Sequence, residues 1–582
     1  MNCLRNKNYQ ILFCILACVF AFSCRKDIGY DNGPVHIPDF TVKVTSSVSG
    51  FITDENDDPI SATVSAGGNT ITADRFGYFE IKNIQVVKTA ATVTVTRPGY
   101  FKSIKTFIAT DQKAAFFRIK LIRKTNSGNI NAASGGNITL SNGLIISLPG
   151  NAVVNAATNA AYSGIVNAAA YWIDPTSTEL NKIMPGDLRG IATDGSLKGL
   201  TTYGMAAVEL TGSGGELLQI ATGYKATLTM PIPVSILSNA PQSIPLWYFD
   251  ETKGLWKQEG QASRSGNNYT GDVSHFSFWN CDVPDSYVEF NCTLKDQNGN
   301  PLPYTLVKIN EIGSSNSSSG YTDESGYVAG LVPDNAQLLL SVLPYTNCVG
   351  SIYSQNISTT NTSISLGTVT ISTSSNTANI SGTVTDCNNS PVLNGYIYLS
   401  AFNHLFRQPI SNSGTFNFPI LMCGNSADIT LIAENTQTLQ QNNPSNHTIH
   451  TGVNAIGNLQ ACGFNAEQFF HYTIDGVNGL FTVPSDNISI VVSAEVWVDA
   501  NGTAGHAGLY FFGLNIGLNS SHNLMGFAAP GWNLGSQVGT DMVHITEYGL
   551  PGQFISGNFT GVLKTNDNVP HSIVCSFRVR RP

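Results

Sequence analysis

Val48-Ser-Gly-Phe-Ile-Thr-Asp54 begins a pattern that recurs twice later in the chain and decides its fold. An apolar segment ends at Asp54, four residues lead to Pro59, and Asp74-Arg-Phe-Gly77-Tyr78 opens the next apolar segment. Asp, Pro and Gly at these positions favour turns, so the pattern predicts strand, turn and strand. The later copies read Cys292-Thr-Leu-Lys-Asp296 with Pro301 and Asp323-Glu-Ser-Gly326-Tyr327, and Ile380-Ser-Gly-Thr-Val-Thr-Asp386 with Pro391 and Ser413-Gly-Thr-Phe416.

The first copy continues into a strict alternation, Ala91-Thr-Val-Thr-Val-Thr96, and closes at Pro98-Gly-Tyr100. Together these features resemble the carboxypeptidase regulatory-like domain, a transthyretin-like β-sandwich, over residues 46–122, 376–463 and, more loosely, 286–372. In that family the module is a non-catalytic appendage, so the resemblance implies an architecture without an active site.

Composition points the same way. Charged residues make up only 12% of the 582-residue chain, and Gly reaches 55. Ser, Thr and Asn supply the missing polarity, and these residues favour turns and strands over helix interiors. The 30 Lys and Arg against 39 Asp and Glu, a net charge of −9, exclude the basic footprint of a nucleic-acid binder. The expected fold class is all-β, with tandem β-sandwiches of transthyretin-like or Ig-like type in an extended multidomain chain.

The N-terminus has the features of a targeting segment. Arg5 and Lys7 precede an uncharged apolar run, residues 11–22, which is too short to cross a bilayer. The run ends in Ala21-Phe-Ser-Cys24, followed by Arg25. This ending resembles the lipobox of a bacterial lipoprotein, which implies cleavage before Cys24, diacylation of Cys24 and attachment to the membrane through several acyl chains. Residue 25 is not Asp, so resemblance to Gram-negative lipoproteins implies an outer-membrane location, periplasmic or surface-exposed.

The middle of the chain contains a second type of module. Gly135-Gly136, two strand patterns and Leu148-Pro149 resemble the entry to the sandwich shared by zonula occludens proteins, netrin receptors and ankyrins. Residues 246–256 and 273–279 resemble the small β-domain that follows it in netrin receptors. Those domains mediate protein–protein contacts. The aromatic and other apolar residues of 246–256 lie on both faces of the expected strand, which predicts that this strand is buried. His275 is expected to be a core residue.

The C-terminal region shows the period of two of strands that pack one face on a core. One run places Ile488, Val492 and Val498 on a single face of an expected strand, and the other places Ile573 and Cys575 on one face. The Gly-rich and aromatic stretch between them, residues 505–535, is interpreted as short strands and turns, with ligand-facing loops as the alternative.

No catalytic or metal-binding constellation is expected. His544-Ile-Thr-Glu547 has the H-x-x-E spacing of zinc carboxypeptidases, but it lacks a fitting third ligand and its local sequence is strand-like. The acidic turn 54–58 lacks the twelve-residue calcium loop and is expected to be a solvated turn. We therefore expect no catalytic residue, no metal and no cofactor.

Cysteine use fits an oxidising compartment. Cys575 points inward in its strand pattern and is the expected buried free thiol. The sequence does not determine how the others pair. The possible disulfide cysteines are Cys281, Cys292, Cys348, Cys387, Cys423 and Cys462.

These features favour a non-enzymatic, lipid-anchored envelope protein whose modules present a domain that binds or adheres to a protein or a glycan. An accessory of an outer-membrane nutrient-uptake complex is the alternative, and a hydrolase with its site in the C-terminal domain is the second alternative. The expected organisation is a signal peptide (1–23), a linker (24–45), a regulatory-like sandwich (46–122), a middle sandwich with a trailing β-subdomain (130–283), a second repeat (286–372), a third, regulatory-like repeat (376–463) and a C-terminal sandwich (464–582).

Overall fold

A computed structural model describes residues 37–314, 317–343, 350–372, 377–422, 424–463, 468–483, 486–535, 541–565 and 568–582. The expected signal peptide, Cys24, Cys348 and Cys423 lie outside these residues. The described chain is almost entirely β-structure, which confirms the all-β prediction; its helical segments are α2 (Leu180–Ile183) and the 3₁₀ segment η1 (Val234–Asn239). No helix in these ranges is long and apolar enough to span a membrane.

The chain divides into two compact units. Of the described residues, one comprises those up to Leu294 and those within Val307–Ser341 and Ser354–Val369, and the other comprises those within Lys295–Leu306, Val342–Tyr353 and Thr370–Pro582.

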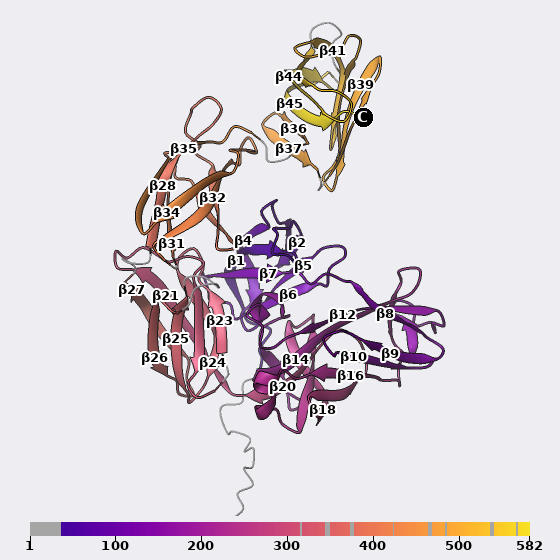
Figure 1. The fold of residues 1–582 in the computed structure, drawn as a ribbon, viewed down its shortest axis with the longest axis vertical. Coiled ribbons are helices and arrows are strands. Elements are labelled where there is room, and N and C mark those ends of the chain that lie inside the picture. Colours follow the sequence, from indigo (N-terminus) through magenta and orange to yellow (C-terminus); the bar gives the residue numbers. More distant parts are fainter. Residues whose placement is uncertain are drawn as a thin grey trace, which may run out of the picture. The chain divides into compact units, whose positions relative to one another are not determined.

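The first sandwich packs sheet β4-β1-β7 on sheet β3-β2-β5-β6 (Figure 1). Strand β1 pairs antiparallel with β4 and parallel with β7. Alternating residues of β5, such as Val93 and Val95, are fully buried between the sheets. Its strands are β1 (Lys43–Thr53), β2 (Thr63–Ala66), β3 (Asn69–Thr72), β4 (Tyr78–Val87), β5 (Ala91–Thr96), β6 (Ser103–Phe107) and β7 (Ala114–Lys120).

The repeated Asp-to-Pro turn has one structure in all three copies. Asp54 Oδ1 accepts hydrogen bonds from the backbone N–H groups two and four residues later, at 2.8 and 3.0 Å. Asp296 and Asp386 accept the equivalent pairs at 2.8 to 2.9 Å. Each Pro then forms an isolated bridge to the residue before its Asp. The carboxylate is thus used to close its own turn, which explains the recurring Asp without a bound cation.

The middle domain is built on one continuous sheet. Thirteen of the described strands belong to it, and the trailing segment joins it through β20 beside β14 and β19 beside β16. Its strands are β8 (Asn126–Asn131), β9 (Gly135–Thr139), β10 (Ile145–Pro149), β11 (Val153–Asn155), β12 (Ile165–Ile173), β13 (Arg189–Ile191), β14 (Leu197–Thr211), β15 (Leu217–Ile220), β16 (Ala226–Pro231), β17 (Ser243–Asp250), β18 (Leu255–Ser265), β19 (Asn268–Val273) and β20 (Phe278–Asp285).

The first sandwich and the middle domain share a hydrophobic core. Phe101 and Ile104 of the first sandwich belong to the same buried cluster as Trp247, Phe249 and Trp256 of the middle domain. Burial of this cluster stabilises the contact between the two domains, because apolar surface of both is removed from water.

Two buried basic side chains lie at this junction. Lys105 of β6, 1% exposed, donates from Nζ to the carbonyl oxygens of Asn181 (2.8 Å) and Met184 (2.7 Å), at the end of α2. Arg189, also 1% exposed, pairs with Asp187 at 2.7 Å and donates from Nη1 to the carbonyl oxygen of Thr89 at 2.6 Å. Each therefore ties polar groups of one domain to the other.

The two later repeats each have two sheets. The second has the orders β24-β21-β27 and β23-β22-β25-β26, and the third has β31-β28-β35 and β30-β29-β32-β33, with β34 beside β32 (Figure 1). Their strands are β21 (Tyr287–Asp296), β22 (Leu306–Glu311), β23 (Ser317–Tyr321), β24 (Tyr327–Pro333), β25 (Gln337–Leu343), β26 (Tyr353–Ser358), β27 (Ile364–Ile371), β28 (Thr377–Thr385), β29 (Gly395–Ala401), β30 (His404–Pro409), β31 (Thr415–Leu421), β32 (Ser426–Asn435), β33 (Gln440–Gln441), β34 (Ser445–His450) and β35 (Gly452–Gln460).

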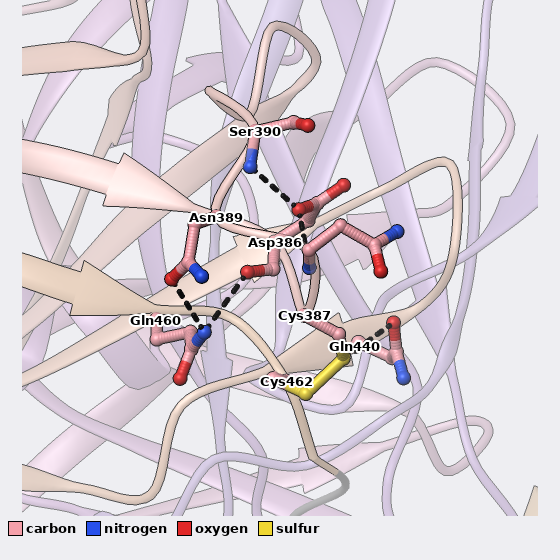
Figure 2. The surroundings of a disulfide bond; sticks show 8 residues. Asp386, Cys387, Asn389, Ser390, Gln440, Gln460 and Cys462 are labelled. Carbon is pink, nitrogen blue, oxygen red and sulfur yellow. Dashed lines mark hydrogen bonds between the residues drawn. A yellow bond between two sulfur atoms is a disulfide. The ribbon is translucent and has the colours of Figure 1, made fainter.

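A disulfide joins Cys387 to Cys462 in the third repeat (Figure 2). The parallel pairing of β28 with β35 sets Thr385 opposite Gln460, so the residues two positions further along each strand meet, with Cα atoms 4.8 Å apart. Gln460 Nε2 also donates to the carbonyl oxygen of Asp386 at 3.2 Å. The disulfide therefore fastens the Asp386 turn to the end of β35.

The remaining described cysteines are buried free thiols. Cys575 matches its prediction. Cys281 and Cys292 do not form the disulfides considered for them: both are free thiols, at most 1% exposed, and burial raises the pKa of the Cys292 thiol to about 12.

Replacing both Cys387 and Cys462 with Ser is expected to lower the free energy of unfolding of the third repeat by about 2–4 kcal/mol, because the bond closes a loop of 75 residues in the unfolded chain. Urea unfolding followed by thermolysin digestion measures the change. A reducing agent should bring the wild-type protein to the variant's midpoint and leave the variant unaffected. Coincident curves for oxidised wild type and variant would contradict the prediction.

The C-terminal domain folds into one sheet in the order β37-β36-β45-β44-β42-β41-β40-β39-β38, with β43 beside β41 and β44. In β45 the inward residues Ile573, Cys575, Phe577 and Val579 are at most 1% exposed, as their alternation predicts. Its strands are β36 (Phe469–Ile474), β37 (Val477–Thr482), β38 (Asn487–Val492), β39 (Glu495–Gly502), β40 (Gly505–Phe512), β41 (Ser521–Ala529), β42 (Trp532–Gly535), β43 (Met542–Tyr548), β44 (Phe554–Lys564) and β45 (Pro570–Arg580).

The single strand expected over residues 488–498 is wrong. The segment forms two antiparallel strands, β38 and β39, joined by a tight turn in which Ser493 Oγ donates to the carbonyl oxygen of Glu495 at 2.7 Å. The apolar alternation continues through the two turn residues, so periodicity alone did not reveal the reversal.

Candidate functional site

Exposed aromatic side chains gather on the outer face of β39 and β40. Trp497 pairs with Val491 of β38 on one side and with Tyr510 of β40 on the other, so these residues form a row across three strands. Trp497 is 42% exposed, and Phe512, two residues beyond Tyr510, is 39% exposed. We call these four residues, Val491, Trp497, Tyr510 and Phe512, the aromatic face.

The Tyr510 side chain lies over Gly508, which is two residues away on the same face of β40. A Cβ atom built on Gly508 would lie 2.8 Å from Cζ of Tyr510 and 3.0 Å from Oδ1 of Asp499. The same row continues to Gly526 of β41, which is also without a side chain. Gly508 leaves the ring room to rest on the backbone, whereas a Cβ atom on Gly526 would only touch the ring, 3.9 Å from its Cδ2.

The Tyr510 ring is held in place by Asp499 of β39. The Tyr510 hydroxyl donates to Asp499 Oδ1 at 3.3 Å, and the same oxygen lies 3.1 Å from Nε2 of His506. Burial, with a contribution from Asp499, raises the pKa of Tyr510 to about 12. The phenol therefore stays protonated as a donor at neutral pH.

The Trp497 indole packs on the Tyr510 ring at an inclined angle. The two ring centroids are 4.5 Å apart, and the ring planes meet at 58°. The two inclined rings form a corner, which we call the aromatic corner, next to the carboxylate of Asp499. Such a corner can hold a flat ligand by stacking and accept hydrogen bonds from its hydroxyl or amine groups.

The aromatic residues that the sequence analysis placed in a core are largely buried. Trp247 and Trp256 are fully buried, and Phe249 is 2% exposed, which confirms the prediction for them. His275 packs on Tyr248, with ring centroids 4.7 Å apart, and burial lowers its pKa. None of these residues is presented to a ligand.

His544 and Glu547 are not brought together. His544 Nδ1 lies 2.7 Å from the hydroxyl of Ser521, whereas Glu547 pairs with Arg578 at 2.8 Å. A bulge between Ile545 and Glu547 further breaks the regular spacing. In the part of the chain that the structure describes, no three His, Cys, Asp or Glu side chains are grouped to hold a metal ion.

The stretch 505–535 folds as the strands and turns that its sequence favoured, yet it supplies Tyr510 and Gly508 to the aromatic face. Sequence reasoning missed the face because it followed the inward residues of β39. The available signal was Trp497, a large aromatic residue at an outward position between Glu495 and Asp499.

No protein-family model matches this chain, and no curated protein matches it. Among solved structures, the shaft pilin SpaA of Lactobacillus rhamnosus GG is 10% identical, with 30% of this chain and 97% of that chain covered and a TM-score of 0.17. The minor pilin GBS52 of Streptococcus agalactiae is 9% identical, with 31% and 97% covered and a TM-score of 0.15. The major pilin subunit BcpA of Bacillus cereus is 8% identical, with 72% and 99% covered and a TM-score of 0.13. Similarity of this extent assigns no function.

Proposed function

We propose that the chain is a non-enzymatic, lipid-anchored protein of the outer membrane whose C-terminal domain binds glycan through the aromatic face. The observation that carries the proposal is the partly exposed Tyr510 ring, seated over Gly508, held by Asp499 and flanked by the exposed Trp497. Apolar side chains that are exposed together on one face of a domain are typical of interaction sites.

Glycan fits this corner better than an extended peptide. The C–H faces of a pyranose ring are flat and apolar and match an aromatic floor, whereas its hydroxyl groups are donors for Asp499. Because the ring and the carboxylate are fixed before binding, little side-chain freedom is lost on association.

The membrane anchor rests on residues outside the described ranges. The run 11–22 and Ala21-Phe-Ser-Cys24 resemble a lipobox, so Cys24 is the proposed site of acylation. Cells grown with a radiolabelled fatty acid should label the wild-type protein and not Cys24→Ser, which lacks the thiol that would be acylated. Equal labelling of the two proteins would contradict the anchor and leave glycan binding untouched.

Trp497→Ala and Gly508→Ala are each expected to weaken glycan binding by about tenfold or more. The first removes the indole from the aromatic corner, and the second displaces the Tyr510 ring. Affinity electrophoresis of the mature chain against a panel of polysaccharides measures the change.

Two matched controls accompany these variants. Gly526→Ala should bind normally, because a Cβ there comes no closer than 3.5 Å to a neighbouring atom. Val562→Ala removes an exposed apolar side chain from β44 of the same domain and should also have no effect. Absence of binding to every polysaccharide, or equal binding by all four variants, would overturn the proposed function.

A further inference from the structure

The charge of the chain is distributed unevenly. Between Arg407 and Lys564 there is no Lys and no Arg, whereas nine acidic residues occur in that stretch, and the rest of the chain has 30 residues of each sign. The formal charge of −9 is therefore carried by the segment that contains most of the third repeat and most of the C-terminal domain. The nine are Asp428, Glu434, Glu467, Asp475, Asp486, Glu495, Asp499, Asp541 and Glu547.

Two of these carboxylates border the aromatic corner. Glu495, Trp497 and Asp499 alternate along β39, so all three belong to its outer face, with a carboxylate on each side of the indole. Residues two apart in a strand are separated by about 6.6 Å, which places both carboxylates within reach of a sugar ring stacked at the corner.

Strands β38 to β41 contain no Lys or Arg to offset these charges. His506 is the basic side chain beside the corner, and its Nε2 is directed to Asp499 Oδ1. A carboxylate or sulfate on the ligand would thus lie near like charges with no described cation to pair with. At about 4 Å in water each such pair weakens binding about fivefold.

From this arrangement we infer that the aromatic face selects uncharged or amine-bearing glycans and rejects acidic ones. The inference rests on the proposed function and narrows its ligand class. Hydroxyl and ammonium groups are donors, and Asp499 and Glu495 supply acceptors. A uronate or sulfate group offers acceptors only.

The test compares three polysaccharides of different charge on the mature chain: dextran or β-glucan, glycol chitosan, and alginate. Binding is measured by affinity electrophoresis at about 20 mM and about 300 mM NaCl, where screening lengths differ several-fold. We expect the neutral polymer to bind with no salt dependence, the amine-bearing polymer to bind more weakly at high salt, and alginate not to bind at low salt.

Glu495→Lys gives the sharpest readout, because it reverses a charge beside the corner without touching the Tyr510–Asp499 contact. It should raise the affinity for alginate by at least about fivefold and leave the affinity for the neutral polymer unchanged. Glu289→Lys, an equal charge change at an exposed position of β21, is the control and should change neither.

The outcomes separate the inference from the proposed function. If wild type binds alginate more tightly than the neutral polymer and Trp497→Ala abolishes that binding, the charge selectivity is wrong and glycan binding stands. If wild type binds only the amine-bearing polymer, and Trp497→Ala binds it equally, charge alone explains the binding and both proposals fail.

Discussion

Arg189→Met is expected to destabilise the body formed by the first sandwich and the middle domain by about 3–5 kcal/mol. Arg189 is 1% exposed, and its guanidinium contacts Asp187 and the Thr89 carbonyl oxygen. Burial raises the pKa of Asp187 even beside this guanidinium. Removing Arg189 therefore leaves the Asp187 carboxyl group and the Thr89 carbonyl group buried without their partner. This lowers the free energy of unfolding by more than the original ion pair contributes to it.

Tryptophan fluorescence during urea unfolding measures this effect, since four of the six Trp residues lie in the middle domain. Arg123→Met is the matched control: Arg123 pairs with Glu55 at the surface, at 2.9 Å and 61% exposed, and its loss should cost at most about 1 kcal/mol. The double variant Arg189→Met, Asp187→Leu should recover part of the loss. Equal midpoints for Arg189→Met and Arg123→Met would contradict this account of the junction.

The sequence predicted those parts of the fold that depend on neighbouring residues. Asp54 and its two counterparts close turns with hydrogen bonds to amides two and four residues away, so the pattern and the structure lie in the same short segment. The strand 573–579 follows equally from alternation. Both are local consequences of side-chain chemistry and backbone geometry.

Contacts between distant segments were beyond this reasoning. Alternation in Ser103-Ile-Lys-Thr-Phe107 indicates an outward Lys105, yet the outward side of β6 is covered by the middle domain and the lysine is buried. The pairing of Cys387 with Cys462 depends on the register of β28 and β35, which are separated by most of the third repeat.

The candidate site shows the same limit. Trp497 and Tyr510 are 13 positions apart and become neighbours only through the β39–β40 register. The role of Gly508 depends on the direction of the Tyr510 side chain, which a sequence pattern does not contain. The low charge of the chain is visible in its composition. The confinement of the net charge to residues 408–563 is also visible in the sequence, but its relevance to ligand choice depends on the aromatic face.

The stability of the same two-domain body should rise between pH 7 and about pH 10 because of Lys105. Burial lowers the pKa of Lys105 from 10.5 to about 7. Below pH 7 both folded and unfolded chains carry the ammonium, and the full cost of burying it is present. Between the two pKa values the folded chain holds a neutral amine while the unfolded chain keeps its proton, so unfolding takes up a proton and becomes less favourable as pH rises.

The expected gain across that range is on the order of 4 kcal/mol, and it should be absent from Lys105→Met. The neutral amine retains two N–H donors, which match the two carbonyl oxygens of Asn181 and Met184, so deprotonation relieves the buried charge without breaking either hydrogen bond. Lys102→Met is the control, because Lys102 is 45% exposed, pairs with Glu251 at the surface and should leave the pH dependence as it is in the wild type. The pH dependence of stability is measured as the urea midpoint, read from tryptophan fluorescence at several pH values. Parallel curves for wild type and Lys105→Met would mean that the lysine does not titrate in this interval, and the buried amine would then have to be charged throughout.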